Sequence, residues 1–230
     1  MKLHVHERGA GDKVALLIHG GMADHRTWHA VEGRLVERGY HVVAPDLRGH
    51  GASDRGEYRP ELLADDLAES LPAGADLAIG HSLGGLALAL AVERLRPQRV
   101  VYSDPGFRLG ALPPRALEFM RAMVDQATRE TVQVSNPRWS AADAAAEVAG
   151  FALFDRRFLD SVARFDGDYL PESPTVPSLV QLADPSLTID DPAAALLRER
   201  GFDLAVVPGA GHCIHRDDLE GFMGSMKAWL

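Results

Sequence analysis

Ser82 in this chain has the setting that nucleophilic catalysis needs. It lies in the stretch Gly80-His81-Ser82-Leu83-Gly84, between the apolar run 76–79 and the apolar segment 83–95. A serine in a G-x-S-x-G pattern between a strand and a helix occupies a sharp, strained turn, and the small residues beside it make room for the neighbouring chain. The turn exposes the hydroxyl at a helix N-terminus, whose free N–H groups favour developing negative charge. We therefore predict that Ser82 is a nucleophile.

His212 is the best candidate for the base that activates this serine. A serine hydroxyl is a weak nucleophile at neutral pH and needs a base within hydrogen-bond reach, most often a histidine. His212 follows the apolar run 203–207 and the flexible segment 208–211. It should therefore lie on a loop at the carboxyl end of a strand, where the functional groups of parallel sheets gather. Among the other histidines, His19 and His81 are expected to brace turns, and His215 either lines the site or has a capping or surface role.

Two aspartates can complete the site, because a carboxylate must accept the Nδ1–H of the base to fix its tautomer. Asp184 is the first choice, since it follows the apolar run 178–182 and precedes His212 by 28 residues, which leaves room for one helix and one strand. Asp104, which ends the run 99–103, is the alternative.

The segment His19-Gly20-Gly21-Met22 is predicted to supply part of an oxyanion hole. It follows the apolar run 14–18, and its glycines allow the backbone to approach a substrate carbonyl closely. The backbone N–H of Gly21 would act together with the N–H of Leu83, and Met22 is the fallback for the first donor.

These residues must be positioned by an α/β fold, because short apolar runs alternate with longer amphipathic ones. The runs predict a mostly parallel sheet flanked by helices. The predicted strands cover 14–18, 41–45, 76–79, 99–103, 178–182 and 203–207, and the predicted helices cover 28–38, 60–71, 83–95, 193–200 and 219–230.

Residues 107–174 interrupt this alternation with several helix-like stretches and prolines at both ends. We predict that 1–106 and 175–230 form the catalytic core and that 107–174 are an inserted helical cap, which lies over the site as a lid.

Four stretches occur in the order and spacing of the α/β-hydrolase superfamily: His19-Gly20-Gly21, 46–53, 80–85 and 209–212. The chain resembles this superfamily over nearly its whole length, with 107–174 at the place of the variable cap. The resemblance implies a Ser-His-Asp hydrolytic machinery. Some members of the superfamily carry the triad acid at the position of Asp104. Members that carry it at the position of Asp184 usually have a glycine and a longer turn before it than the tight Ala183-Asp184-Pro185.

The resemblance implies a hydrolase that cleaves an ester or lactone of a small, largely apolar substrate through an acyl-enzyme. Carbon–carbon bond hydrolysis, or a cofactor-free lyase or cyclase step, on the same triad is the alternative. The alternative outside enzymes is a non-catalytic member of the fold that binds a small ligand. Ser82 in place of an aspartate argues against dehalogenase and epoxide-hydrolase chemistry.

The charge of the chain limits its partners. Its 230 residues carry a formal net charge of −9, and Lys and Arg do not cluster. This removes the electrostatic attraction that dominates nucleic-acid binding. We therefore expect a small-molecule substrate as the partner, with no nucleic acid and no membrane.

We expect neither a cofactor nor a metal. His25 and His29 are four residues apart, but their segment lacks the glutamate of a zinc-binding helix and suggests no third ligand. The single cysteine, Cys213, cannot form an internal disulfide, and the first residues lack the apolar run of a secretory signal. The expected location is the cytoplasm.

Overall fold

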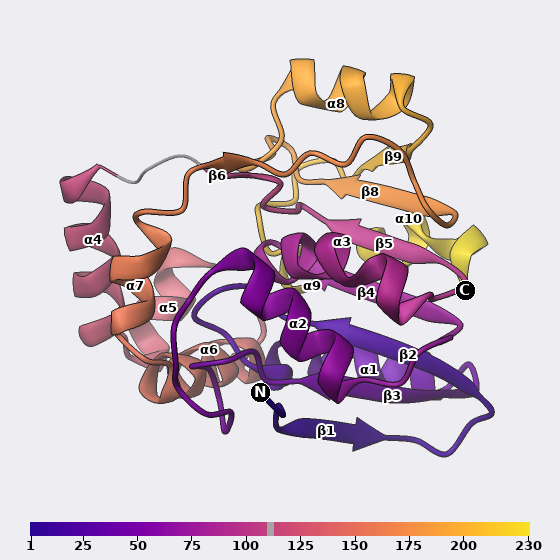
Figure 1. The fold of residues 1–230 in the computed structure, drawn as a ribbon. Coiled ribbons are helices and arrows are strands. Elements are labelled where there is room, and N and C mark those ends of the chain that lie inside the picture. Colours follow the sequence, from indigo (N-terminus) through magenta and orange to yellow (C-terminus); the bar gives the residue numbers. More distant parts are fainter. Residues whose placement is uncertain (110–112) are drawn as a thin grey trace.

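The computed structural model describes residues 1–109 and 113–230, and within them seven strands form one sheet (Figure 1). The strand order is β1-β3-β2-β4-β5-β8-β9. β1 runs antiparallel to β3, and the other neighbouring pairs are parallel. The strands are β1 (Val5–Arg8), β2 (Lys13–Ile18), β3 (Tyr40–Pro45), β4 (Leu77–His81), β5 (Val100–Ser103), β8 (Ser178–Leu182) and β9 (Asp203–Val206).

Both faces of the sheet are covered, which explains why its central strands are continuously apolar. In β2, Leu16 and Ile18 pack into the hydrophobic cluster on one face, and Ala15 and Leu17 pack into the cluster on the other. The first cluster holds side chains of α2 (Pro60–Ser70), α3 (Leu83–Leu95) and α8 (Asp191–Glu199). The second holds side chains of η1 (His25–Trp28), α1 (His29–Val36), α9 (Ile214–Asp217) and α10 (Leu219–Ser225).

The parallel arrangement brings the loops that follow the strands to one edge of the sheet. The carboxyl ends of parallel strands meet at the same edge, so residues that follow β2, β4, β5 and β9 become neighbours despite their separation in the chain. The six predicted strands are confirmed within a few residues, and they place Ser82, Asp104, Asp184 and His212 after β4, β5, β8 and β9.

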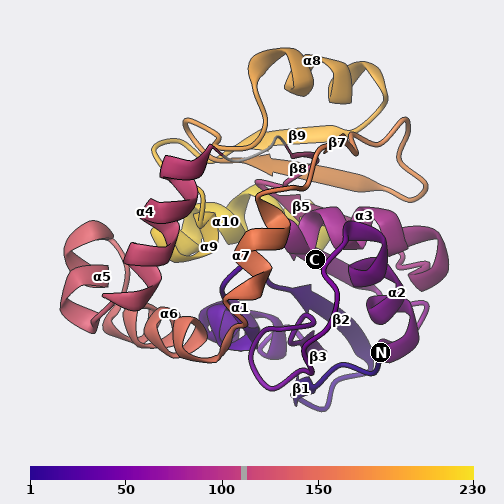
Figure 2. The same cartoon turned by 60° about the vertical axis from the view of Figure 1, so that its left-hand side comes forward.

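Helices α4–α7 lie together at one side of the sheet (Figure 2). They are α4 (Pro114–Asp125), α5 (Arg129–Ser135), α6 (Ala141–Leu153) and α7 (Arg157–Val162), and a short ribbon pairs β6 (Arg108–Leu109) with β7 (Gly167–Asp168). The phenyl rings of Phe151, Phe154 and Phe158 join the same hydrophobic cluster as the sheet. This segment therefore packs on the sheet, while its division from the rest as a cap stays a prediction.

Several elements differ from the sequence-based expectation, among them β1 and the C-terminal helix. Strand β1 was not predicted, because it is a short edge strand in which the burial follows no clear alternation. The expected helix over 219–230 ends at Ser225 and is followed by a short 3-10 turn, η2 (Lys227–Trp229). Among the helices of the described residues, none is long and apolar enough to cross a membrane.

A buried ion pair connects the loop after β3 to helix α2. The Arg48 guanidinium donates to both carboxylate oxygens of Asp66, with Nε and Nη2 at 2.5 and 2.7 Å. The N-terminal ammonium of Met1 also donates to Asp66. Both side chains are almost fully buried, so each charge depends on its partner.

Asp66→Asn should lower the free energy of unfolding by about 3 to 5 kcal/mol, because it leaves the Arg48 charge buried without a counter-ion. Urea unfolding followed by circular dichroism would measure this. The neighbouring Asp65 pairs with Arg94 at the surface, so Asp65→Asn should cost at most about 1 kcal/mol. Equal effects of the two substitutions would contradict the role given to the buried pair.

Candidate active site

The turn at Ser82 has the strained backbone expected of an exposed nucleophile. Ser82 has φ 52° and ψ −118°, a conformation that non-glycine residues rarely adopt. A Cβ at Gly80 would lie 2.6 Å from the carbonyl oxygen of Gly84, and one at Gly84 would lie 2.3 Å from that of His19. Both positions therefore require glycine, because larger residues would collide with backbone.

Ser82, His212 and Asp104 form one hydrogen-bonded chain. The Ser82 hydroxyl donates to His212 Nε2 at 2.9 Å, and His212 Nδ1–H donates to Asp104 Oδ2 at 2.6 Å. Ser82 and His212 are partly exposed, whereas Asp104 is fully buried. This geometry lets the imidazole take the proton of the hydroxyl while the carboxylate fixes its tautomer.

The loop after β8 holds the Asp104 carboxylate from its other side. Oδ1 accepts the Ser186 hydroxyl at 2.5 Å and the Ala183 N–H at 3.3 Å. Burial raises the pKa of Asp104, but the hydrogen bonds from His212 and Ser186 outweigh it, so the pKa lies below its ordinary value. Asp104 is therefore ionised at neutral pH, as a partner of an imidazolium should be.

Asp184, the first choice from the sequence, does not contact His212. Its Oδ2 accepts the Gly209 N–H at 3.0 Å and thereby connects the loops after β8 and β9. The structure brings Asp104 to His212 instead, because the backbone of the Ser82 turn is bonded to that segment: Ser82 N–H donates to Ser103 O, and Gly106 N–H donates to Ser82 O. Placing Asp184 beside the base was therefore wrong, and the alternative, Asp104, occupies that place.

Gly21 and Leu83, the predicted oxyanion donors, are neighbours. A Cβ at Gly21 would lie 3.8 Å from the Leu83 side chain. The Leu83 N–H is the first of helix α3 and lacks an intrahelical acceptor. Among the described residues, the Gly21 N–H donates to no acceptor, whereas that of Met22 donates to His50 Nε2 at 3.0 Å. The N–H of Met22, the fallback oxyanion donor, is thus already hydrogen-bonded, and the N–H of Gly21 stays the predicted donor.

Buried histidines hold the loops around the site. His19 donates from Nδ1 to Gly20 O and accepts the Leu47 N–H at Nε2, so it joins the loops after β2 and β3. His81 donates from Nε2 to the carbonyl of His212 at 2.9 Å. His50 donates from Nδ1 to Arg48 O in addition to accepting from the Met22 N–H. Sequence reasoning included His50 only in the superfamily-like stretch 46–53 and missed its contact, because no local pattern shows that its ring accepts the Met22 N–H.

These rings are neutral. Burial, and next to it the nearby histidines His19 and His212, lower the pKa of His50 and of His81, respectively, to about 3. Burial also lowers the pKa of His19. A neutral ring has one donor and one acceptor nitrogen, which is what the contacts of His19 and His50 use.

Stability should therefore fall in mild acid. In the unfolded chain His50 and His81 return to the ordinary pKa of 6.5. Between pH 7 and pH 5 the unfolded chain takes up protons that the folded chain does not, so the free energy of unfolding decreases by about 1 to 2 kcal/mol per buried histidine. Urea unfolding at the two pH values measures this.

His25 has the opposite effect on the pH dependence of stability, because the hydrogen bond to Asp46 raises the pKa of its ring. This single group does not cancel the effect of the several buried histidines whose pKa is lowered. His50→Gln should reduce the loss by one histidine's share. A chain that is equally or more stable at pH 5 would show that these rings are not held neutral.

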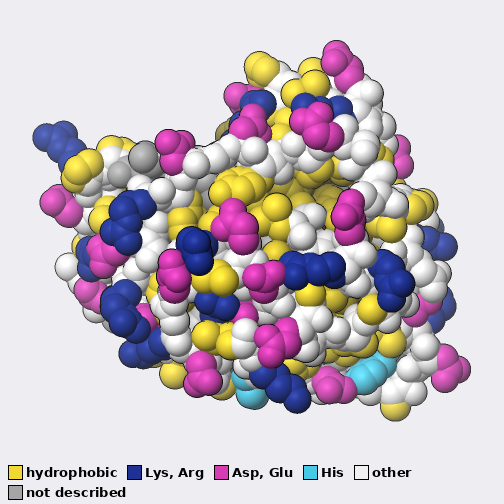
Figure 3. Space-filling model, viewed as in Figure 1, with side chains coloured by type: hydrophobic (Ala, Val, Ile, Leu, Met, Phe, Trp, Pro, Cys, Tyr) yellow, Lys and Arg dark blue, Asp and Glu magenta, His cyan; other side chains and the backbone are white. Residues whose placement is uncertain are grey.

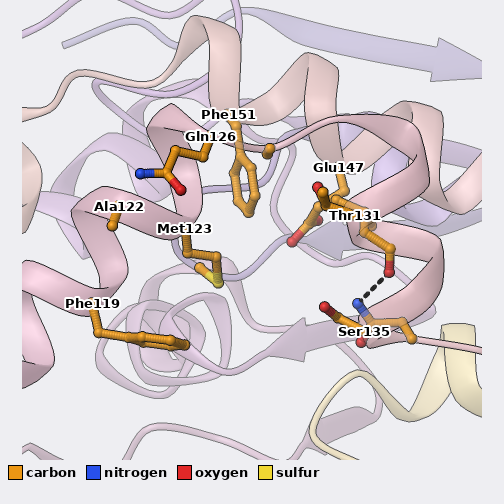
Figure 4. Close-up of a pocket in the computed structure, with 11 residues that line it drawn as sticks. Phe119, Ala122, Met123, Gln126, Thr131, Ser135, Glu147 and Phe151 are labelled. Carbon is orange, nitrogen blue, oxygen red and sulfur yellow. Dashed lines mark hydrogen bonds between the residues drawn. The ribbon is translucent and has the colours of Figure 1, made fainter.

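The segment 107–174 lies close to the site on two sides. On one side, Phe158 of α7 lies over the oxyanion loop, since a Cβ at Gly21 would be 3.5 Å from its ring. On the other, Glu147 of α6 accepts a hydrogen bond from Arg216, four residues after His212. Between α4, α5 and α6 lies a cavity of about 340 Å³, lined by apolar groups that include Phe119, Met123 and Phe151 (Figure 4).

Comparison with known proteins supports the fold. The model of the alpha/beta hydrolase family matches residues 15–223, which is most of the chain and includes Ser82, Asp104 and His212. The match confirms the predicted fold class.

Curated relatives match over a shorter stretch. An uncharacterized protein of Mycobacterium tuberculosis is 36% identical over 121 residues, which cover 46% of this chain and 35% of the relative. The pyrethroid hydrolase of Sphingobium wenxiniae is 38% identical over 92 residues, which cover 37% of this chain and 32% of that enzyme. The matched part thus spans about a third of the length of these relatives.

An esterase of Exiguobacterium antarcticum has a similar fold, with a TM-score of 0.77, 17% sequence identity and coverage of 99% of this chain and 94% of that one. This likeness concerns the fold.

Proposed function

The chain belongs to the alpha/beta hydrolase family, and from this premise we propose that it is a serine hydrolase that cleaves an ester or lactone of a small, largely apolar substrate. The observation that carries the proposal is the hydrogen-bonded chain from Ser82 through His212 to Asp104. The names of similar proteins, an esterase and a pyrethroid hydrolase, support hydrolysis.

The first half of the reaction forms an acyl-enzyme. Ser82 Oγ attacks the carbonyl carbon while His212 Nε2 takes the hydroxyl proton, and the carbonyl π electrons move to the oxygen. The resulting imidazolium is stabilised by the ionised Asp104, to which it donates at 2.6 Å. When the tetrahedral intermediate collapses, the bond to the alcohol oxygen breaks and His212 gives the proton to that leaving group.

The negative oxygen of the intermediate is stabilised by the N–H groups of Gly21 and Leu83. The N–H at the start of α3 also benefits from the helix dipole. One such donor contributes about 3 to 4 kcal/mol to transition-state stabilisation. His50 supports this arrangement indirectly, because it holds the N–H of Met22, the residue next to Gly21.

The second half releases the product acid. A water molecule gives a proton to His212 Nε2 and attacks the acyl carbon, and the collapse of the second intermediate returns the proton to Ser82 Oγ. No oxidant, reductant or metal is needed for these steps.

Ser82→Ala should reduce kcat on a p-nitrophenyl ester by about a millionfold, because the attacking oxygen is lost. A fluorophosphonate probe should label the unaltered chain at Ser82 and leave the variant unlabelled. Unchanged turnover of the variant would show that Ser82 is not the nucleophile. An unaltered chain that neither turns over the ester nor is labelled at Ser82 would favour a non-catalytic ligand-binding protein.

Substitution of each of the two aspartates tests which one is the triad acid. Asp104→Asn should lower kcat by about four decades, because the amide holds His212 in the wrong tautomer. Asp184→Asn should leave kcat within a few-fold of the unaltered chain, since Asp184 bonds to Gly209 instead. Circular dichroism and urea unfolding would check that both variants fold. A larger loss from Asp184→Asn would contradict the role proposed for Asp104.

We assign the apolar part of the substrate to the cavity of about 340 Å³ between α4, α5 and α6. Glu147 of its lining accepts a hydrogen bond from Arg216, four residues after His212. Its lining is largely apolar, as is typical of sites for small ligands.

Met123→Trp should fill part of this cavity and raise KM for hexanoate and octanoate esters by about tenfold, which corresponds to a loss of about 1.4 kcal/mol in binding. Acetate esters, whose acyl group is too short to reach the cavity, should be turned over as before. Val134, which is exposed on α5 and does not line the cavity, is the control position. If Val134→Trp has the same effect, or if neither substitution changes chain-length preference, the acyl group binds elsewhere.

A further inference from the structure

Two histidines and an aspartate from three separate segments of the chain lie close together. His4 precedes the edge strand β1, His25 begins η1 and Asp46 follows β3. One ligand atom from each of the three lies within 4.8 Å of the others. Within residues 1–109 and 113–230, this is the group of histidine and carboxylate side chains close enough to share a metal ion. Its members are not part of the catalytic chain around Ser82.

We propose that His4, His25 and Asp46 form a binding site for a divalent transition-metal ion, with Zn²⁺ as the best fit. Imidazole nitrogen and carboxylate oxygen are ligands that Zn²⁺ prefers, and three protein ligands leave a fourth position for water.

The distances in the cluster are close to those that coordination needs. His25 Nδ1 lies 2.8 Å from Asp46 Oδ1, and His4 Nδ1 lies 3.1 Å from Asp46 Oδ2. Ligand atoms bound to tetrahedral Zn²⁺ at about 2.0 to 2.1 Å are about 3.4 Å apart. The two ring nitrogens therefore need to move back from the carboxylate by less than about 1 Å, and they lie within 4.8 Å of each other. The Nδ1 protons that now bind the carboxylate leave for Nε2 or solvent when the metal enters.

The carboxylate is already held in position by backbone. Asp46 Oδ1 accepts the His25 N–H at 2.9 Å, and Oδ2 accepts the Ala52 N–H at 2.9 Å. A Cβ at Gly51 would lie 2.2 Å from Oδ2, so the glycine lets this loop close over the carboxylate. Such outer contacts orient a ligand, and losing one typically weakens metal binding about 10- to 100-fold.

The site is open to solvent on the side of the histidines. The side chains of His4 and His25 are 45% and 20% exposed, whereas that of Asp46 is 1% exposed. Histidine side chains reach the surface along the edge of the molecule where β1 lies (Figure 3). The His6 ring stacks on that of His25, with centroids 4.7 Å apart, and limits the rotation of the His25 ring. A metal ion thus has both an entry path and oriented ligands.

A bound ion would connect three segments that are distant in the sequence. His25 lies four residues after Gly21, so the ion would attach the oxyanion loop to β1 and to the end of β3. Because the unfolded chain cannot present the three ligands together, binding adds to the stability of the folded state.

The test is titration of the EDTA-treated, desalted full chain with Zn²⁺ alone by calorimetry, followed by thermal unfolding. We expect one ion per chain at this site and a rise in Tm of about 5 to 10 °C when free Zn²⁺ is a hundredfold above Kd. Co²⁺ in place of Zn²⁺ should give the visible absorption of a nitrogen- and oxygen-ligated ion.

His4→Gln removes one ligand from an exposed position and should weaken binding by about 10- to 100-fold or more. His41→Gln is the matched control, since His41 also lies at the surface of this sheet edge but pairs with Glu7, and it should bind Zn²⁺ as the unaltered chain does. The rate of ester hydrolysis distinguishes this site from the catalytic one, because His4→Gln should leave that rate unchanged.

Two results would overturn the proposal. Equal Zn²⁺ affinity of His4→Gln and the unaltered chain would place the ion elsewhere, for example at His212. Absence of Zn²⁺ binding in the unaltered chain, together with a lower Tm of His4→Gln without metal, would show that the cluster is held by hydrogen bonds alone.

Discussion

The left-handed turn at Ser82 is the constraint on which the rest of the site depends. It can form only because Gly80 and Gly84 bring β4, α3 and the end of β2 into backbone contact. The same turn is bonded to the segment after β5 through Ser82 N–H and Ser82 O. The conformation that exposes the hydroxyl therefore also sets the positions of the oxyanion loop on one side and of Asp104 on the other.

Loops, rather than regular elements, carry the chemistry, and buried neutral histidines hold these loops in place. His19 joins the loops after β2 and β3, His50 joins the same loops at a second point, and His81 attaches the loop that carries the base. A neutral imidazole suits this task because it offers a donor and an acceptor in one ring. Their neutrality requires burial, so the packing that excludes water also maintains the hydrogen bonds.

The helices of residues 107–174 do not enclose a large core of their own. Phe151, Phe154 and Phe158 pack into the cluster that covers one face of the sheet, and the Tyr58 hydroxyl donates to Asp155 at the start of α7. Phe158, one of the residues that attach this segment to the sheet, is also the one that approaches Gly21. Attachment of the segment and the shape of the site are coupled through this ring.

The sequence by itself determined the parallel sheet and singled out Ser82 and His212, because each depends on a local pattern: buried runs, a glycine-flanked serine, and a histidine after the last strand. It left the acid open between Asp104 and Asp184. Both follow neighbouring parallel strands, β5 and β8, and so reach the same edge of the sheet. Only the tertiary structure decided which carboxylate meets His212 and brought His4, His25 and Asp46 together, because these contacts join residues that no local pattern connects.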